Sequence, residues 1–254
     1  MKLTGNTIFI TGGTSGIGRG LAEALHKLGN KVIISGRRTA LLAEVTAANP
    51  GMAAITLDVT SLDSIQAAAR ELIEKHPDLN VVFNNAGFLP FDDVSGPVDD
   101  ALTQDLITTN LLGPIRVTSA LIEHLKTKAD ATVLYTSSVL AFVRIASNAV
   151  YSATKAALHS FALSQRFQLR NTNVRVQEIA PPWVDTDLIY KSGDPRAMPL
   201  PDFIEQTLVA LAADDPEVIV EAVRPLRDNP GANEHALFDA FNQSLVENPI
   251  PVGA

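Results

Sequence analysis

The amino-acid sequence predicts a single α/β domain, in which a doubly wound parallel sheet of seven strands carries helices on both faces. Short, continuously apolar segments alternate with longer segments whose apolar residues recur at helical spacing. The apolar segments lack the alternation of a half-exposed strand, so both of their faces are expected to be covered. The chain of 254 residues shows no linker, repeat or low-complexity segment, and one α/β domain spanning residues 1–254 fits this length.

The first half of the chain repeats a strand–helix unit three times and begins a fourth. Its first apolar run, NTIFIT, is rich in β-branched residues and leads through a glycine-rich turn into a helical pattern. The later units repeat this alternation of an apolar strand and a helix, which is typical of parallel strands joined by right-handed crossovers. The strands predicted here cover residues 6–11, 31–35, 52–58 and 79–87, and the helices cover residues 19–30, 39–49 and 64–76.

The second half continues the alternation until the strand VRVQEIA. Residues 181–201, which follow it, are rich in proline and turn-forming residues, and this composition predicts an irregular loop over the carboxyl edge of the sheet. Regular patterns then return up to the end of the chain. The strands predicted in this half cover residues 131–137, 174–180 and 217–221, and the helices cover residues 98–127, 149–170, 203–214 and 232–248.

The composition excludes several kinds of site and partner. Apolar residues make up 46% and charged residues 19% of the chain, which is the balance of a folded globular protein. A net charge of −8 argues against a nucleic-acid partner. The chain has no cysteine and its five histidines are scattered, so we expect neither disulfides nor a metal. The start lacks a signal segment and no apolar run reaches membrane length, which predicts a cytoplasmic protein without a membrane partner.

The glycine-rich segment TGGTSGIG at residues 11–18 lies between the first strand and the first helix. In that context Gly12 permits a tight turn, Gly16 lets the backbone approach a phosphate, and Gly18 allows the helix to contact the strand. The amino end of the helix would then face a pyrophosphate with its favourable dipole. The alternative is a turn that merely needs glycine, and the strand before it and the helix after it favour the phosphate site.

Beyond this turn the sequence resembles the short-chain dehydrogenase/reductase family, whose fingerprint is T-G-x-x-x-G-x-G. The resemblance implies a Rossmann-type fold and an NAD(P)-dependent oxidoreductase that acts on CH–OH and C=O groups. Pro182 stands where the family usually has glycine, and with MKLTGNT and LAFV it resembles the branch named after an oxidoreductase of the teichoic-acid D-alanylation operon. The matching segments are NNAG at 84–87, TTNLLG at 108–113, YTSS at 135–138, YSATK at 151–155 and PPWVDT at 181–186.

The end of the second strand favours NADP(H) as coenzyme and leaves NAD(H) possible. Family members that use NAD generally place an acidic residue there, where it binds both ribose hydroxyls. In this chain Gly36 occupies that place, and Arg37 and Arg38 follow it. A guanidinium can bind a 2′-phosphate bidentately, and no carboxylate repels it. The alternative is that one or both arginines begin the next helix as solvated surface residues.

Other coenzyme contacts follow from the resemblance. It assigns Asp58 to the adenine, although Asp58 could equally be the N-cap of the next helix, a place that Ser61 could also take. It assigns Asn85, Ala86 and Gly87 to the adenosine ribose, and Val184 and Thr186 to the nicotinamide carboxamide. The predicted coenzyme-binding set is Gly12, Thr14, Ser15, Gly16, Ile17, Gly18, Arg37, Arg38, Asp58, Val59, Asn85, Ala86, Gly87, Tyr151, Lys155, Val184 and Thr186.

The segment YSATK suggests the acid–base chemistry. Tyr151 and Lys155 are four residues apart on a predicted helix, so both lie on one face of it. A phenol ordinarily has a pKa near ~10, and a nearby ammonium favours its phenolate form. Tyr151 would then give a proton to a carbonyl oxygen, or take one from an alcohol, as general acid or base. The resemblance adds the nicotinamide ribose hydroxyls as a partner of Lys155.

Two more residues complete the family's catalytic tetrad. Ser138 ends the fifth predicted strand at the sheet edge where ligands bind, and its hydroxyl can polarise the substrate oxygen. Ser137 is the alternative, but the spacing to Tyr151 favours Ser138, and Ser137 is expected to bond to the backbone. Asn110 lies in a predicted helix, where asparagine is a poor helix former. The resemblance makes Asn110 the holder of a relay water, and the alternative is a surface amide without a role.

The residues that flank these motifs predict a largely apolar substrate. None of them is a lysine or arginine suited to anchor a carboxylate, apart from the nearby Arg144, which leaves that question open. We therefore expect a carbonyl reductase or secondary alcohol dehydrogenase for a small ketone or alcohol. The candidate pocket residues are Phe88, Leu89, Leu140, Phe142, Trp183, Ile189 and Tyr190.

Two other functions share this scaffold. A halohydrin dehalogenase keeps the serine and tyrosine but gives its dinucleotide site to halide, and the intact glycine turn and Lys155 argue against it. A dinucleotide sensor without catalysis would be expected to lose Tyr151 or Lys155, and both are present. The helical stretches at 98–127 and 149–170 carry more apolar surface than one sheet face needs. The family pairs these helices between subunits, so a homodimer or homotetramer is expected.

Overall fold

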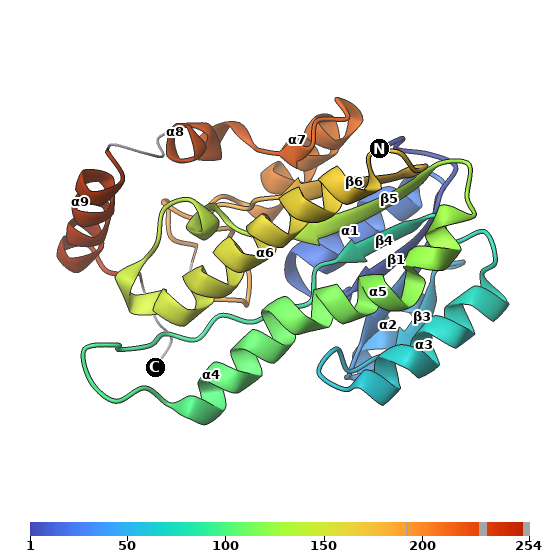
Figure 1. The fold of residues 1–254 in the computed structure, drawn as a ribbon, viewed down its shortest axis with the longest axis horizontal. Helices are drawn as coiled ribbons and strands as arrows, with labels where there is room; N and C mark the ends of the chain where they lie inside the picture. Colours follow the sequence, from blue (N-terminus) through green and yellow to red (C-terminus); the bar gives the residue numbers. More distant parts are fainter. Residues whose placement is uncertain (192, 229–232, 251–254) are drawn as a thin grey trace.

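The protein is an α/β sandwich built on a seven-stranded parallel sheet (Figure 1). The computed structural model describes residues 1–191, 193–228 and 233–250. Within them the strands pair in the order β3-β2-β1-β4-β5-β6-β7, so the order reverses between β1 and β4. The strands are β1 (Thr7–Thr11), β2 (Lys31–Gly36), β3 (Ala53–Thr56), β4 (Val81–Asn84), β5 (Ala131–Thr136), β6 (Val174–Ile179) and β7 (Glu217–Val218).

Helices cover both faces of the sheet and enclose two separate cores. In Figure 1, α5 and α6 lie in front of the sheet and α1 lies behind it. Alternate residues of β1 point to opposite cores: Ile8 and Ile10 pack with α1, α2 and α7, whereas Phe9 packs with α3, α5 and α6. These helices are α1 (Gly16–Lys27), α2 (Thr39–Ala48), α3 (Leu62–Lys75), α4 (Asp100–Ile107), α5 (Gly113–Lys126), α6 (Ala149–Leu169), α7 (Leu200–Ala212), α8 (Arg224–Arg227) and α9 (Glu234–Glu247).

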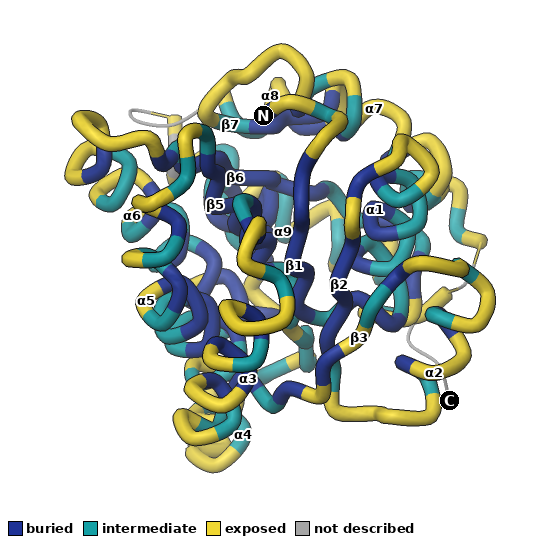
Figure 2. Tube along the Cα trace, turned by 90° about the vertical axis from the view of Figure 1, so that its right-hand side faces the viewer, coloured by how far each residue is buried: buried dark blue, intermediate teal, exposed yellow. Residues whose placement is uncertain are grey.

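The predicted fold class is confirmed, and the central strands are as buried as their continuous apolar runs predicted. Every residue of β1, β4 and β5 is buried, and the tube in Figure 2 shows the inner strands dark while the surrounding turns are exposed. Among the described residues, no helix has both the length and the apolar character needed to cross a bilayer.

Two elements differ from the sequence-based expectation, and the start of a third lies outside the described residues. The helix predicted at 98–127 consists of α4 and α5 joined by a π-helical turn, Thr108–Leu112. The strand predicted at 217–221 ends after Val218, because the chain then turns through a 3₁₀ segment, Glu221–Val223, into the unpredicted short helix α8. The last predicted helix was expected from residue 232, which lies outside the described residues, and α9 is described from Glu234.

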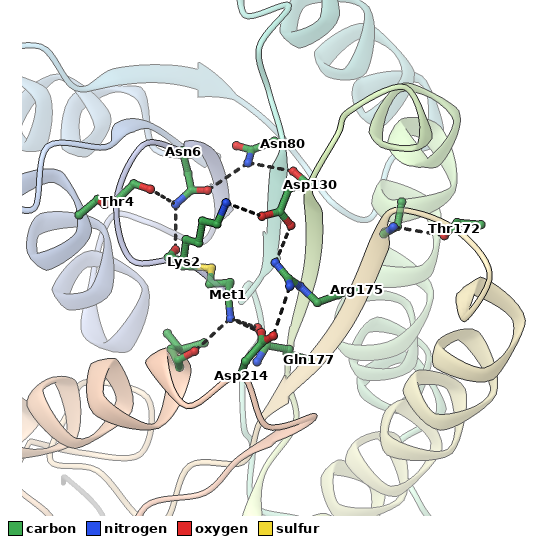
Figure 3. Close-up of polar contacts among 12 residues, drawn as sticks. Met1, Lys2, Thr4, Asn6, Asn80, Asp130, Thr172, Arg175, Gln177 and Asp214 are labelled. Carbon is green, nitrogen blue, oxygen red and sulfur yellow. Dashed lines mark hydrogen bonds and ion pairs between the residues drawn. The ribbon is translucent and has the colours of Figure 1, made fainter.

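A polar network ties the start of the chain to the amino ends of the strands, opposite the carboxyl edge (Figure 3). The ammonium group of Met1 donates to Asp214 Oδ1 and to Gln177 Oε1, both at 2.8 Å. Arg175, in β6, pairs with Asp214 and also with Asp130, which precedes β5. The ammonium is buried, with a relative exposure of 1%, so Asp214 provides the charge that compensates its desolvation.

The substitution Asp214→Asn should therefore lower the free energy of unfolding. It keeps the shape of the side chain, and asparagine tolerates the positive φ of 62° at this position. Because the carboxylate is 46% exposed, we expect a loss of only about 1–2 kcal/mol in urea unfolding at pH 7. The exposed neighbour Asp215→Asn is the matched control and should leave stability nearly unchanged.

The same pair predicts how the difference depends on pH. The hydrogen bond from the Met1 ammonium lowers the pKa of Asp214 below its ordinary value, despite the opposing effect of burial. Asp214 therefore stabilises the fold above the pKa that it has in the unfolded chain, and this stabilisation is lost as the pH falls through the folded-state pKa. The wild-type advantage over Asp214→Asn should shrink in acid, and an advantage independent of pH would contradict the assignment.

Candidate active site

A large cavity runs along the carboxyl ends of the central strands. Its volume is about 1560 Å³, which exceeds the roughly 300–1,000 Å³ of a site for one small ligand and leaves room for a coenzyme beside a substrate. It lies where the strand order reverses between β1 and β4, the place where open α/β sheets bind ligands. All predicted coenzyme-binding and catalytic residues line this cavity except Asn110.

The glycine turn between β1 and α1 depends on close backbone contacts. Gly12 has a φ of +68°, and a Cβ there would lie 2.8 Å from the Cα of Ala86, in the loop after β4. At Gly18 a Cβ would lie 2.3 Å from the Gly12 carbonyl oxygen. The hydroxyl of Thr11 accepts hydrogen bonds from the backbone N–H groups of Asn85 and Ala86 at 3.0 and 3.1 Å. No larger residue fits at Gly12 or Gly18 without moving the two loops apart.

The amino end of α1 opens toward the cavity. Its N-cap, Ser15, makes no side-chain hydrogen bond to the first turn, so the amides of that turn keep no side-chain acceptor. Gly16 has a φ of +53°, and a Cβ there would meet only the side chain of Thr186 at 3.6 Å. Thr14, Ser15, Gly16 and Ile17 all line the cavity. This glycine cradle with free amides fits a phosphate group, since both the backbone shape and the helix dipole favour an anion.

The side chains beyond β2 form a basic end of the cavity. Arg37 and Arg38 are exposed and both line it, and an Arg38 Nη2 donates to Thr14 Oγ1 at 3.4 Å. Gly36 ends β2, and a Cβ at this position would only touch the methyl group of Thr14 at 3.4 Å. Arg38 is also the N-cap residue of α2, without a side-chain capping bond, so one of the two arginines does begin the next helix.

Asp58 is not a helix cap. The N-cap of α3 is Ser61, whose hydroxyl accepts from the Ser64 N–H at 3.2 Å. The Asp58 carboxylate instead accepts from the backbone N–H and the hydroxyl of Thr60, at 2.9 and 2.7 Å, and lines the cavity with Val59. Burial alone would raise the pKa of Asp58, but the two bonds from Thr60 hold it below its ordinary value, with help from the charge of Arg37. The side chain is thus a carboxylate at neutral pH.

Helix α6 positions Tyr151, and a residue from another loop caps its amino end. Asp92, which follows β4, accepts from the backbone N–H groups of Ala149 and Val150 at 2.8 and 2.9 Å. The phenol of Tyr151 has Ser138 as a hydrogen-bonding partner at the end of β5. The Ser138 hydroxyl also accepts from a backbone N–H two residues on, at 3.1 Å. The cap orients the first turn of α6, and that turn carries Tyr151 to the end of β5.

Ser137 bonds to the backbone, as expected. Its hydroxyl donates to the Ile179 carbonyl at 3.4 Å, and its own N–H bonds the same carbonyl at 2.9 Å. Ser138, by contrast, is the serine beside Tyr151.

The charge state of the tyrosine–lysine pair differs from the sequence-based expectation. The Lys155 Nζ lies 5.4 Å from the centre of the Tyr151 ring, yet burial raises the pKa of Tyr151, and the hydrogen bond with Ser138 only partly opposes this. Burial also lowers the pKa of Lys155 to about 8, against the attraction of Glu178. Both groups are buried, so the desolvation of charge outweighs the expected acidification of the phenol by the ammonium.

Asn110 lies behind the cavity wall and not in it. Its side chain is fully buried in the π-helical turn, which excludes the surface-amide alternative. The amide accepts from the Phe88 N–H at 3.1 Å and donates to the Phe88 carbonyl at 2.9 Å. A Cβ on Gly87 would lie 3.0 Å from Asn110 Oδ1 and 3.8 Å from Lys155 Nζ. Asn110 therefore fixes the loop after β4 directly beside the lysine.

The far end of the cavity is built largely by the carboxy-terminal part of the chain, which the sequence did not indicate. Asn242, on α9, donates to the Arg144 carbonyl at 3.0 Å and accepts from the Ala146 N–H, and this holds α9 beside the start of α6 (Figure 1). The only signal was the helical pattern of the last residues, which says nothing about where the helix packs. The wall residues that sequence reasoning missed are Ile145, Leu226, Phe241, Ser244, Leu245, Glu247, Asn248 and Ile250.

Some of the predicted pocket residues line the cavity and others do not. Two of them do not line the cavity: Tyr190 is exposed, and Phe142 packs its ring against His159 and under Arg227. Arg144 does not line it either, and one of its nitrogens donates to the Phe142 carbonyl at 3.0 Å. The predicted residues that do line the cavity are Phe88, Leu89, Leu140, Trp183 and Ile189.

The loop at 181–201 lies over the carboxyl edge of the sheet, as predicted, and carries an unpredicted arginine into the cavity. The loop is held by a bridge between Val184 and Met198. Arg196 pairs with Asp194, donates to the backbone carbonyls of Asn248 and Pro249, and lies 5.3 Å from the centre of the Trp183 ring. This arginine ties the loop to the end of α9.

Comparisons with known proteins agree with this geometry. Residues 6–196 match the family model described as short chain dehydrogenase. The uncharacterized oxidoreductase DltE of Bacillus subtilis is 38% identical over 248 residues, covering 95% of this chain and 98% of that protein. The NADP-dependent 3-hydroxy acid dehydrogenase of Schizosaccharomyces pombe is 30% identical over 254 residues, covering 91% of this chain and 96% of its own length.

A solved structure shares the whole fold. The short chain dehydrogenase of Burkholderia cenocepacia, crystallised in complex with NADP, superposes with a TM-score of 0.83, covering 99% of this chain and all of that chain at 25% identity. The match to DltE confirms the branch indicated by Pro182 and the flanking segments. The chain belongs to the short-chain dehydrogenase family of oxidoreductases.

Proposed function

We propose that this protein is an NADP(H)-dependent carbonyl reductase, or secondary alcohol dehydrogenase, for a small and largely apolar ketone or alcohol. One observation carries the proposal: Ser138, Tyr151 and Lys155 converge in a cavity that also contains the glycine cradle of α1. The phenol and the serine hydroxyl lie within bonding reach of each other, so a substrate oxygen between them could accept a hydrogen bond from both.

The proposed reaction needs one proton from the protein. The coenzyme, when bound, supplies or accepts the hydride at the substrate carbon. In the direction of reduction, the O–H bond of Tyr151 breaks as its proton passes to the carbonyl oxygen, which Ser138 holds through a hydrogen bond. The Lys155 ammonium then stabilises the phenolate that forms. In the direction of oxidation the phenolate takes the proton back from the alcohol.

The raised pKa of Tyr151 favours the role of general acid. Burial keeps the phenol protonated at neutral pH, so a proton is available for reduction. Lys155 has a pKa of about 8 because of burial and is mostly charged at pH 7. Asn110 acts indirectly, through its two hydrogen bonds to the backbone of Phe88. These bonds fix the loop that contains Gly87, which lies beside the ammonium group of Lys155.

The residues present suit NADP(H) better than NAD(H). Gly36 leaves no carboxylate to repel a 2′-phosphate, and the guanidinium groups of Arg37 and Arg38 line the same end of the cavity. The binding of NADP by the Burkholderia cenocepacia relative and the NADP dependence of the Schizosaccharomyces pombe enzyme support this choice. NAD(H) is the alternative coenzyme.

The substrate end supports an uncharged molecule. Its walls are mainly the apolar side chains of the loops and of α9, and the carboxylate of Glu247 also lines the cavity. Arg196 is the cation at this end, and Asp194 already pairs with its guanidinium. A carboxylate substrate would have to compete for that arginine. The named substrate of the Schizosaccharomyces pombe relative, a 3-hydroxy acid, is therefore a second candidate that depends on Arg196 alone.

The two rival functions find less support. A halide site would leave the glycine cradle and the Lys155 ammonium without a ligand. A coenzyme sensor would not need Ser138 beside the phenol of Tyr151.

We further propose that the chain forms a homodimer or homotetramer through α4, α5 and α6. Large apolar side chains are exposed on the outer faces of these helices: Phe167 is 65% exposed and Leu163 is 43% exposed on α6, and Ile107 is 36% exposed on α4. Exposed apolar side chains on neighbouring helices are typical of a surface that is covered by a second copy.

Activity on a panel of ketones tests the proposed function. With NADPH, acetophenone-like ketones should be reduced with a kcat/KM about tenfold or more above that of keto acids, because a buried carboxylate would lack a free cation. The measurement is the loss of NADPH absorbance under initial-rate conditions. A preference for keto acids would favour the hydroxy-acid alternative, and no turnover with either class would contradict the carbonyl reductase.

The variant Tyr151→Phe is the control for the chemistry. It removes the proton donor and keeps the ring, so turnover should fall by about 10³-fold or more while NADPH binds with nearly the same affinity. Affinity is measured by fluorescence titration. Turnover that survives this change would remove Tyr151 from its role as general acid.

Coenzyme preference tests the basic end of the cavity. The double variant Arg37→Gln with Arg38→Gln should lower the ratio of kcat/KM for NADPH over NADH by about 10–100-fold, because two charge-assisted bonds to the 2′-phosphate are lost. Gly36→Asp should lower the ratio further, since its Cβ fits beside Thr14 and its carboxylate repels the phosphate. Arg70→Gln, on the surface of α3, is the control. A ratio equal to that of the wild type in both site variants would contradict the assignment.

Light scattering tests the assembly. The wild type should be a dimer or tetramer at micromolar concentration, and Phe167→Glu should shift it toward the monomer because a charge would be buried in the interface. Leu62→Glu, at an apolar position on α3 that is 51% exposed, should leave the assembly unchanged. A monomeric wild type would rule out the proposed interface.

A further inference from the structure

One turn beyond Lys155 on α6, His159 contacts a buried carboxylate. Its Nδ1 lies 2.7 Å from Oε2 of Glu178, and the Glu178 side chain is 1% exposed. Because a carboxylate is an acceptor, Nδ1 carries the proton and donates it. Spacing of four residues puts Lys155 and His159 on the same face of the helix. The face that carries the proposed catalytic lysine therefore also carries a histidine bound to a buried acid.

The sheet brings Glu178 close to the carbonyl group that binds the lysine. Lys155 Nζ donates to the Thr136 carbonyl of β5 at 2.8 Å. In the paired strands Thr136 lies opposite Ile179, and Tyr135 lies opposite Glu178, so the acid is next to the anchor of the lysine. The second oxygen of Glu178, Oε1, is buried and has no hydrogen-bond partner among the described residues. A buried carboxylate with one free oxygen requires positive charge nearby.

Other charged groups surround this acid. Glu217, in β7, lies opposite Glu178 in the sheet and binds both nitrogens of the Arg227 fork at 2.7 and 2.9 Å. Arg166, further along α6, donates to the Val176 and Pro216 carbonyls. The ring of Phe142 separates His159 from Arg227: it lies 5.0 Å from the imidazole in an edge contact and 4.7 Å from the guanidinium.

The charges of this cluster argue against a metal ion. Ligand atoms of His159, Glu178 and Glu217 lie within 4.8 Å of one another, a spacing that a divalent cation could use. The two carboxylates already face three cations of the protein, from Arg227, Arg166 and Lys155. A divalent ion would add to this positive excess and would have to displace the Arg227 fork from Glu217. The protein's own cations therefore fill the role that a metal would have.

We propose that Glu178, oriented by His159, is the buried counter-charge of Lys155 and a positioning residue of the active site. The carboxylate touches neither the substrate nor the coenzyme, because it does not line the cavity. It acts through the lysine: its negative charge makes the charged form of a buried ammonium less costly. Only the effect on turnover rests on the proposed function, because the contact itself does not depend on any ligand.

The electrostatic consequence has a definite sign. Burial lowers the pKa of Lys155 to about 8, and Glu178 is the charge that opposes this. Without the carboxylate the ammonium would lose its proton at a lower pH. The other groups that face Lys155, Glu178 or the neighbouring Glu217 are Tyr151 and His159 on α6 and the arginines Arg166 and Arg227. Glu178 is the charge that favours the ammonium form of Lys155 against the effect of burial.

The direct test follows the protonation of Lys155 without substrate or coenzyme. In protein labelled with ¹³C at lysine Cε, the NMR signal of Lys155 is assigned by its loss in Lys155→Met and titrated with pH. Its midpoint should lie near 8 in the wild type. In Glu178→Gln, which keeps the shape of the side chain, the midpoint should move to lower pH by about one unit. Glu71→Gln makes the same chemical change on the surface of α3 and should leave the midpoint unchanged.

Variants of His159 provide a second test if Glu178→Gln does not fold. His159→Leu removes the donor that holds the Glu178 carboxylate in place, so the Lys155 midpoint should also fall. His159→Asn keeps an N–H donor near the position of Nδ1 and should restore most of the midpoint. A midpoint unchanged in Glu178→Gln would overturn the proposal. Equal midpoints in His159→Leu and His159→Asn would do the same.

A kinetic measurement separates this inference from the proposed function. In Glu178→Gln the kcat/KM for ketone reduction should decline at a pH about one unit below that of the wild type, while its maximum is within about tenfold of the wild-type value. If the Lys155 midpoint shifts in Glu178→Gln but no form of the protein reduces ketones, Glu178 remains the counter-charge of Lys155 and the proposed carbonyl reductase activity is overturned. If the wild type and Glu178→Gln reduce ketones with the same pH profile, the carbonyl reductase activity stands and the role of Glu178 as counter-charge is overturned.

Discussion

The active site depends on the burial of a single ammonium group. Lys155 is 3% exposed and lies between the end of β5, the π-helical turn and the body of α6. A charged amine in such surroundings loses most of its hydration and is stable only where acceptors and a negative charge replace it. The Thr136 carbonyl is the acceptor, and Glu178 in the neighbouring strand is the charge. The side chain of Lys155 therefore links the position of α6 to the carboxyl ends of β5 and β6.

The coenzyme end depends on a different constraint, the absence of side chains. Gly12 and Ala86 bring the loops after β1 and β4 into backbone contact at the point where the strand order reverses, and Gly18 brings α1 against the same turn. Contacts of this kind leave amide groups free to face the cavity, because no Cβ stands between them and a ligand. The two ends of the cavity are thus built differently: a buried charge lies beside Tyr151 at one end, and closely packed backbone forms the glycine turn at the other.

The sequence was sufficient for the parts of the molecule whose signals are local. Apolar runs predicted the seven strands, and short motifs placed Tyr151, Ser138 and the glycine cradle in one cavity. Interactions between distant residues were not predictable. The π-helical turn that buries Asn110 against Phe88 and the contact between His159 and Glu178 each depend on partners at least 19 residues away. The raised pKa of Tyr151 was missed for the same reason, because burial cannot be read from a spacing of four residues.

The wall of the substrate end is supplied by the part of the chain with the weakest sequence pattern, and the fold explains why. The carboxyl edge of the sheet is open on the side of β6 and β7, so something beyond β7 has to cover the apolar loops there. Helix α9 does so: Asn242, in the body of the helix, binds the segment just before α6, and Arg196 from the loop after β6 binds the backbone just past the helix's carboxyl end. Asn242 binds Arg144 and Ala146, a few residues before Tyr151, whereas Arg196 binds the carbonyls of Asn248 and Pro249. Residues 233–250 supply walls at this end of the cavity, while Tyr151 and Lys155 are carried by α6, so different elements form the wall and hold the two side chains proposed for proton transfer.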